Sequence, residues 1–158
     1  MISDRVQKLL IEQVGHEVRA HQLYLGISLY FERQSLSRWA KLFYAQSMEE
    51  AGHATKVMEF LNDNSVAYDL PALRAATTRY TSAAQAAQTA LDNERRVTAQ
   101  FQEMSKVALE ENDHTSYQFL QWFVNEQVEE ERKVQGLIDL IASGINLFQA
   151  EPLLDQFE

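Results

Sequence analysis

The sequence predicts an all-α protein built as a four-helix bundle, and three observations support this. Only 5 Gly and 2 Pro occur in 158 residues, so few positions interrupt a helix. Four long segments carry apolar residues at alternating steps of three and four, the period of a helix with one buried face. The breaks within each pair of segments are short, while the stretch between the pairs is long. This spacing indicates two antiparallel hairpins joined by one long crossover.

The first hairpin is predicted from two periodic segments, at about residues 3–33 and 36–62. We expect Ser35 to cap the second of these helices and the run Asn62–Ser65 to end it. The residues that follow, including Pro71, show no clear periodicity. This connection, from about residue 66 to residue 81, is long for a compact protein, and its length is explained if it crosses the whole bundle.

The second hairpin is predicted at about residues 82–110 and 114–142, separated by a short break at Asn112 and Asp113. Gly144 is a suitable helix stop. Residues 145–158 could form a short fifth helix, whose extent Pro152 limits. The total length favours a single domain spanning residues 1–158.

Composition excludes several classes of protein. The chain has no Cys, which rules out disulfides, zinc–thiolate sites and iron–sulfur clusters. Its net charge of −9 disfavours nucleic acid and anionic membranes as partners and suits attraction of cations. We find neither a cationic leader nor an apolar run long enough to span a bilayer, and therefore expect a cytoplasmic protein.

Polar residues interrupt the apolar faces of all four predicted helices, and they repeat at a constant offset. Three of them recur 77 positions later: Glu17, Glu50 and His53 correspond to Glu94, Gln127 and Glu130. Within each half, the last two positions are one helical turn apart. This pattern indicates one helical hairpin used twice, with each copy supplying side chains to a shared site.

Metal binding explains these buried acids better than a structural role does. Unpaired carboxylates in a protein interior cost several kcal/mol each, and four together repel one another. A cation supplies the missing positive charge. Carboxylates with one imidazole suit iron or manganese, whereas calcium prefers oxygen ligands alone. A single acid on a buried helix face, or a lone His53, is commonly structural; the repeated set of six favours a metal site.

Two neighbouring features are open to more than one interpretation. Tyr24 lies two turns from Glu17 on the same helix face, so its ring should point toward the site. It could be a core tyrosine that hydrogen-bonds a ligand carboxylate, or it could take part in redox chemistry. The charged run Glu129–Lys133 resembles a solvated helix face, with only Glu130 in the buried register.

Together these residues resemble the bacterial non-haem ferritins over essentially the full chain. The matching segments are Glu17 with Tyr24, Glu49-Glu50-x-x-His53, Asp92-Asn93-Glu94, Asn125–Glu130 and the tail Gly144–Phe148. The resemblance implies a ferritin-like bundle with one long crossover and a short C-terminal fifth helix. It also implies an iron-storage ferritin subunit whose di-iron ferroxidase centre oxidises Fe²⁺ to Fe³⁺. The family deposits ferric mineral inside a shell of twenty-four subunits.

The resemblance further implies a role for each site residue. Glu17, Glu50 and His53 would hold the first iron, and Glu50 would bridge to a second iron held mainly by Glu94 and Glu130. Gln127 would orient oxygen or a bound water beside the pair. A possible third iron position matches Glu49, Glu126, Glu129 and Glu130. Tyr24 and Trp122 would supply electrons or hydrogen bonds while oxygen or hydrogen peroxide is reduced.

The chain also departs from a related group. Bacterioferritins resemble it but carry a second Glu-x-x-His and a haem-ligating Met just after the first bridging Glu. Here the second pair is Gln127-x-x-Glu130, and Ala51 follows Glu50. We therefore expect iron and no haem.

The sequence is also compatible with two other functional classes. One is a di-iron or di-manganese bundle oxidase that stores no mineral, and the other is a helical scaffold whose buried acids are structural. Twenty-four copies of an 18.2 kDa chain would form an assembly of about 437 kDa, whereas a dimeric oxidase would be about 36 kDa. A scaffold should not accelerate the oxidation of Fe²⁺ in air.

Overall fold

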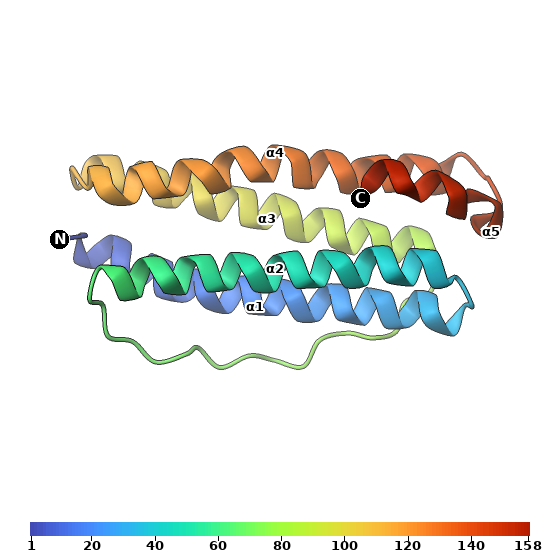
Figure 1. The fold of residues 1–158 in the computed structure, drawn as a ribbon, viewed down its shortest axis with the longest axis horizontal. Coiled ribbons are helices and arrows are strands. Elements are labelled where there is room, and N and C mark those ends of the chain that lie inside the picture. The colour runs from blue at the N-terminus through green and yellow to red at the C-terminus, as the bar shows by residue number, and fades with distance from the viewer.

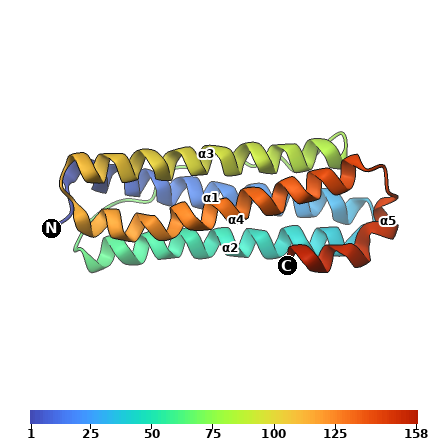
Figure 2. The ribbon, with the colours of Figure 1, turned by 90° about the horizontal axis from the view of Figure 1, so that it is seen from above.

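The computed structural model describes residues 1–158, and it is helical with no strand. Its four long helices are α1 (Asp4–Arg33), α2 (Ser37–Asp63), α3 (Ala83–Glu110) and α4 (His114–Ala142). Helices α1 and α2 form one antiparallel pair and α3 and α4 the other, and the two pairs pack along their length (Figures 1 and 2). Both the predicted bundle and its helix boundaries, to within one residue, are confirmed.

Side chains cap three of the four long helices, and the exception corrects a prediction. Ser3, Ser82 and Asp113 each accept a hydrogen bond from a backbone N–H in the first turn of their helix. The expected cap at Ser35 is wrong. Ser35 has φ 59° in the turn that closes α1, where the Leu36 N–H donates to the Phe31 carbonyl at 3.1 Å. Leu36 then precedes α2 without a side-chain cap.

The apolar core is divided into two clusters along the bundle. One cluster contains Trp39 and Phe43, and the other contains Phe101 and Phe123. On each long helix, at least one buried polar residue falls between the positions that enter the first cluster and those that enter the second. The core therefore has a polar layer near its middle, and this layer holds the candidate site.

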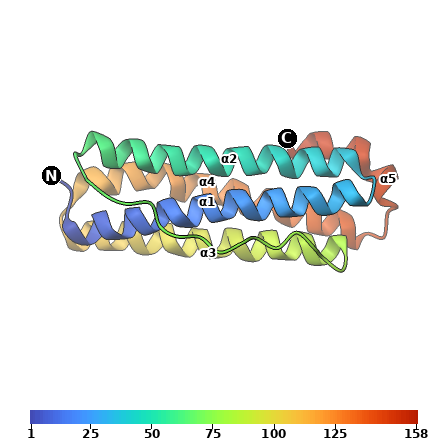
Figure 3. The ribbon, with the colours of Figure 1, turned by 90° about the horizontal axis from the view of Figure 1, so that it is seen from below.

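The connection between α2 and α3 runs along α1 for most of the length of the bundle (Figure 3), as the sequence predicted. Two glycines of α1 allow it to lie close. A Cβ at Gly15 would lie 3.0 Å from the Pro71 side chain, and one at Gly26 would lie 2.0 Å from the Thr77 carbonyl oxygen. The crossover is therefore docked on backbone that only glycine leaves accessible.

The C-terminal segment contains a short helix, α5 (Leu147–Ala150), followed by the 3-10 helix η1 (Glu151–Phe157). Gly144, at φ 79°, lies just beyond the end of α4, as expected of a helix stop. The segment then turns back along α2 and α4 (Figure 2). The Trp39 indole N–H donates to the Leu147 carbonyl at 2.9 Å, which ties the segment to the core. None of the helices is both long enough and apolar enough to cross a lipid bilayer.

Candidate metal centre

The six residues selected by the sequence repeat come together inside the bundle. All are at most 6 % exposed, and they are Glu17 from α1, Glu50 and His53 from α2, Glu94 from α3, and Gln127 and Glu130 from α4. Each long helix therefore contributes at least one of them. The helical register explains this convergence, because each residue occupies the buried face of its helix between apolar neighbours.

Within this set, the ligand-type atoms form two groups that share one residue. Glu17, Glu50 and His53 offer atoms that all lie within 4.8 Å of one another, and so do Glu50, Glu94 and Glu130. Glu50 belongs to both groups. Its carboxylate thus lies where it could contact two cations at once.

Amide and hydroxyl donors orient these carboxylates. Gln13 Nε2 donates to Glu17 at 2.8 Å, and Gln127 Nε2 donates to Glu94 Oε2 at 3.1 Å. The Tyr24 hydroxyl also donates to Glu94, so the predicted direction of its ring is confirmed.

Gln46 links two of the acids. Its Nε2 donates to Glu50 Oε1 at 3.0 Å and to Glu130 Oε2 at 2.7 Å. Sequence reasoning left Gln13 and Gln46 out of the site, although a signal was present. Each lies one turn before a site acid, and the two are 33 positions apart, the same spacing as Glu17 and Glu50.

Burial and mutual repulsion favour protonated carboxyls at this site. Burial, reinforced by the charge of Glu50, raises the pKa of Glu17 well above its usual range. The same two causes, with the charge of Glu130, raise the pKa of Glu94 to about 8. Burial and Glu50 raise the pKa of Glu130 to about 7, against the opposing effect of Lys133. A metal cation that displaces these protons would stabilise the ionised carboxylates.

Two other titratable side chains respond to the acids. Burial alone would lower the pKa of His53, but the hydrogen bond and charge of Glu50, whose Oε2 lies 3.0 Å from His53 Nδ1, raise it to about 9. Burial, followed by the charge of Glu94, raises the pKa of the Tyr24 hydroxyl well above its usual range. Tyr24 is therefore a neutral hydrogen-bond donor at physiological pH.

The residues present fit a pair of divalent transition-metal ions. Glu17 Oε2 is buried and has no hydrogen-bond donor, so one full carboxylate oxygen faces the site without a partner. Four carboxylates and one imidazole form a donor set suited to iron. The mutual repulsion of the buried carboxylates and the unpartnered oxygen of Glu17 both indicate that cations bind at this place.

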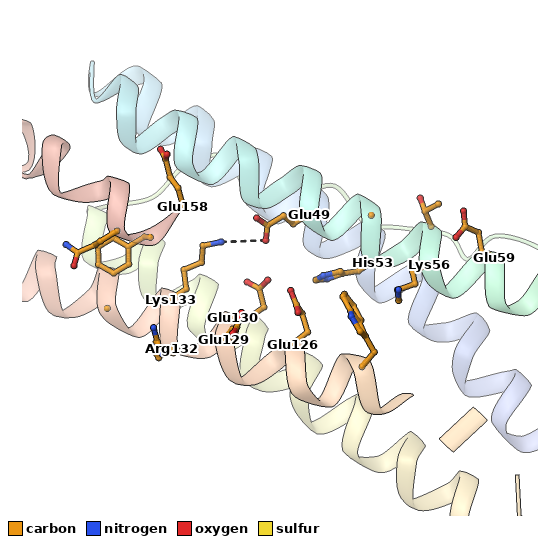
Figure 4. A pocket seen from close by; sticks show the side chains of 16 residues that line it. Glu49, His53, Lys56, Glu59, Glu126, Glu129, Glu130, Arg132, Lys133 and Glu158 are labelled. Carbon is orange, nitrogen blue, oxygen red and sulfur yellow. Dashed lines mark ion pairs between the residues drawn. The ribbon is translucent and has the colours of Figure 1, made fainter. Parts of the chain in front are cut away.

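The residues implied for a third iron position lie at the edge of the site, around a groove of about 990 Å³ between α2 and α4 (Figure 4). Glu126 offers an atom within 4.8 Å of atoms from His53 and Glu130. Glu129 lines the groove but is exposed. Glu49 instead faces Lys133, with 3.5 Å between its Oε2 and the lysine Nζ.

Trp122 also lines this groove. Its ring meets that of His53 edge to face, with centroids 5.7 Å apart, and Lys56 Nζ lies 4.3 Å from the Trp122 ring centroid. The indole is therefore in contact with a site residue, although it is 41 % exposed.

A four-helix bundle with one long crossover and a buried layer of carboxylates around a histidine has the architecture of the carboxylate di-metal bundle proteins. The model for the ferritin-like domain family matches residues 7–143. The chain belongs to the ferritin family, as its resemblance to bacterial non-haem ferritins predicted.

Individual relatives agree with this assignment. The chain is 36 % identical over 151 residues to the ferritin BfrB of Mycolicibacterium smegmatis, covering 95 % of this chain and 83 % of that protein. It is 30 % identical over 141 residues to a bacterial non-heme ferritin of Staphylococcus aureus, with 89 % and 85 % covered. A novel open pore ferritin from the archaeon Archaeoglobus fulgidus superposes with a TM-score of 0.93 at 28 % identity, covering 98 % of each chain.

Proposed function

We propose that this chain is an iron-storage ferritin subunit that oxidises Fe²⁺ at a di-iron centre inside its own bundle. The observation that carries the proposal is the position of Glu50, which belongs to two groups of buried ligand-type atoms. Two cations bound there would share one carboxylate and be held close together, which suits a reaction that takes electrons from both. We assign the whole of residues 1–158 to this one functional domain.

In this proposal iron is the substrate. Glu17 and His53 bind the first Fe²⁺, Glu94 and Glu130 bind the second, and Glu50 bridges them. Oxygen or hydrogen peroxide accepts the electrons, and the ferric product moves on to be stored as mineral. The protein's part is to fix the ligands through the surrounding hydrogen bonds and to release protons as the cations enter.

The remaining site residues have supporting roles. Gln127 donates to Glu94 and lies at the same level of the bundle, where it can orient oxygen or water. Tyr24 holds Glu94 through its hydroxyl and is placed to donate an electron or a proton. We propose that mineral collects inside a closed shell of twenty-four subunits, by analogy with the family.

Aerobic addition of Fe²⁺ to the assembled protein tests the proposal. We expect ferric absorbance to develop much faster with the wild-type protein than in buffer alone. Glu50→Ala should reduce this rate at least about tenfold, because both cations lose a ligand. Glu59→Ala is the matched control, since Glu59 is an exposed acid on the same helix that lines the same groove. A Glu50→Ala protein as fast as wild type would remove Glu50 from the bridging role.

A further inference from the structure

Lys133 places a positive charge beside the candidate metal centre. It lies three residues after Glu130 on α4, and its side chain is only 21 % exposed. The lysine Nζ donates to Gln46 Oε1 at 2.8 Å and lies 3.5 Å from Glu49 Oε2. Figure 4 shows the ammonium directed across the groove from α4 toward Glu49 on α2.

The contact with Gln46 fixes this ammonium in place. Because Lys133 donates to the amide oxygen, the amide nitrogen of Gln46 must face inward, where it donates to Glu50 and Glu130. If the amide were turned around, its oxygen would face two carboxylates. The lysine is therefore one end of a hydrogen-bonded chain that leads to the site acids, and it is not a freely moving surface cation.

The position of the ammonium bears on how many cations the groove can hold. Glu49, Glu126 and Glu130 all line it, and a metal ion held between Glu49 and Glu130 would take oxygen ligands from this set. The Lys133 ammonium, 3.5 Å from Glu49 Oε2, already occupies the side of Glu49 that faces the groove. Its positive charge repels any metal ion that would bind beside it. The other lysine of the groove, Lys56, instead lies over the Trp122 ring.

We propose that the Lys133 ammonium takes the place of a third metal ion between Glu49 and Glu130, so that each subunit binds two metal ions. This inference rests on the proposed function, because it presupposes a metal pair at Glu17, Glu50, His53, Glu94 and Glu130. It opposes the three-iron arrangement that the resemblance to bacterial ferritins suggested.

Zinc, which binds similar ligands without being oxidised, allows the sites to be counted. Crystals of the assembled protein soaked in Zn²⁺ are examined by anomalous diffraction, and equilibrium dialysis gives the stoichiometry. We expect two zinc ions in the wild-type subunit and none in contact with both Glu49 and Glu130. Lys133→Gln, which removes the charge, should admit a third ion there.

Two variants serve as controls. Lys56→Gln removes a positive charge from the same groove without touching Gln46 or Glu49, and it should keep two ions. Lys133→Arg keeps the charge and should also keep two. A third zinc in the wild-type protein, or none gained by Lys133→Gln, would overturn the inference while leaving the proposed function intact. If both zinc ions were absent from the buried site, the proposed function itself would be contradicted.

Discussion

At the scale of single residues, the metal-free site holds protons where the metal-loaded site would hold cations. The pKa of Glu94 is raised to about 8, that of Glu130 to about 7 and that of His53 to about 9. Each value exceeds that of the same group in an unfolded chain. At pH values between the unfolded-state and folded-state pKa of each group, the folded protein therefore binds more protons than the unfolded one. Its stability must fall as the pH rises through that range.

We therefore expect the melting temperature of the metal-stripped protein to decrease between about pH 5.5 and pH 8.5. The stabilisation from protonated His53 is complete below about pH 6.5 and is lost toward pH 9, while the cost of ionising Glu94 grows between about pH 4.5 and pH 8. Both effects have the same sign. Calorimetry should show a shallower decrease for Glu94→Gln than for Glu103→Gln, which alters an exposed acid of the same helix. A melting temperature that rises with pH would contradict this account.

Tyr24 offers a second prediction at this scale. Phenylalanine fills nearly the same buried volume but cannot donate to Glu94. Tyr24→Phe should therefore bind the same number of Zn²⁺ ions as wild type, while its stopped-flow Fe²⁺ oxidation should change several-fold in rate or in the decay of intermediates. Tyr44→Phe, at an exposed position on α2, is the control. An unchanged time course would make Tyr24 only a core residue.

The site acids could be identified from the sequence because they repeat at a constant offset, and recognising that repeat needs no knowledge of the fold. Gln13 and Gln46 share the 33-residue spacing of Glu17 and Glu50, but Ala90 and Phe123 stand 77 positions after them, so the repeat that marks the acids does not mark these glutamines. Lys133 had no comparable signal. Its charged neighbours suggest a solvated face, and only the packing of α4 against α2 shows that its side chain reaches Gln46.

At the scale of elements, helices were predictable from periodicity, whereas the contacts made by the C-terminal segment were not. The first turn of α2 illustrates the difference. Its Arg38 N–H donates to Glu151 of η1 at 3.1 Å, a partner 113 positions away. Local sequence suggested Ser35 as the cap, because nothing near α2 indicates that the C-terminal segment returns to that end of the bundle.

The crossover shows the same limit and leads to a stability prediction. Its length indicated that it spans the bundle, but only the structure explains Gly26, where a Cβ would meet the Thr77 carbonyl at 2.0 Å. Gly26→Ala should therefore displace the crossover and lower the unfolding free energy by about 1–3 kcal/mol. Gly52→Ala has open space around its Cβ and should instead stabilise α2 by up to about 1 kcal/mol. Urea denaturation of both variants measures these effects, and equal stabilisation by both would show that the crossover is not docked at Gly26.

At the scale of the whole molecule, several large apolar side chains are exposed on the surface of the isolated chain. They include Leu29 on α1, Leu70 and Leu73 on the crossover, and Leu109 on α3. Such residues are expected where subunits meet. The exposed apolar positions and the family assignment together favour a closed symmetric assembly over an isolated bundle.

The size of that assembly separates a storage protein from a bundle oxidase. Light scattering coupled to gel filtration should give about 437 kDa for twenty-four chains of 18.2 kDa, and a value near 36 kDa would favour a dimeric oxidase. Leu70 is 68 % exposed in the isolated chain, so Leu70→Glu should leave the helical fold intact but weaken the assembly if the crossover lies between subunits. Gln102→Glu adds the same charge at an exposed position of α3 and should not change the size. If Leu70→Glu kept the full mass, the crossover would face solvent, and the contacts that close the shell would have to come from other faces of the bundle.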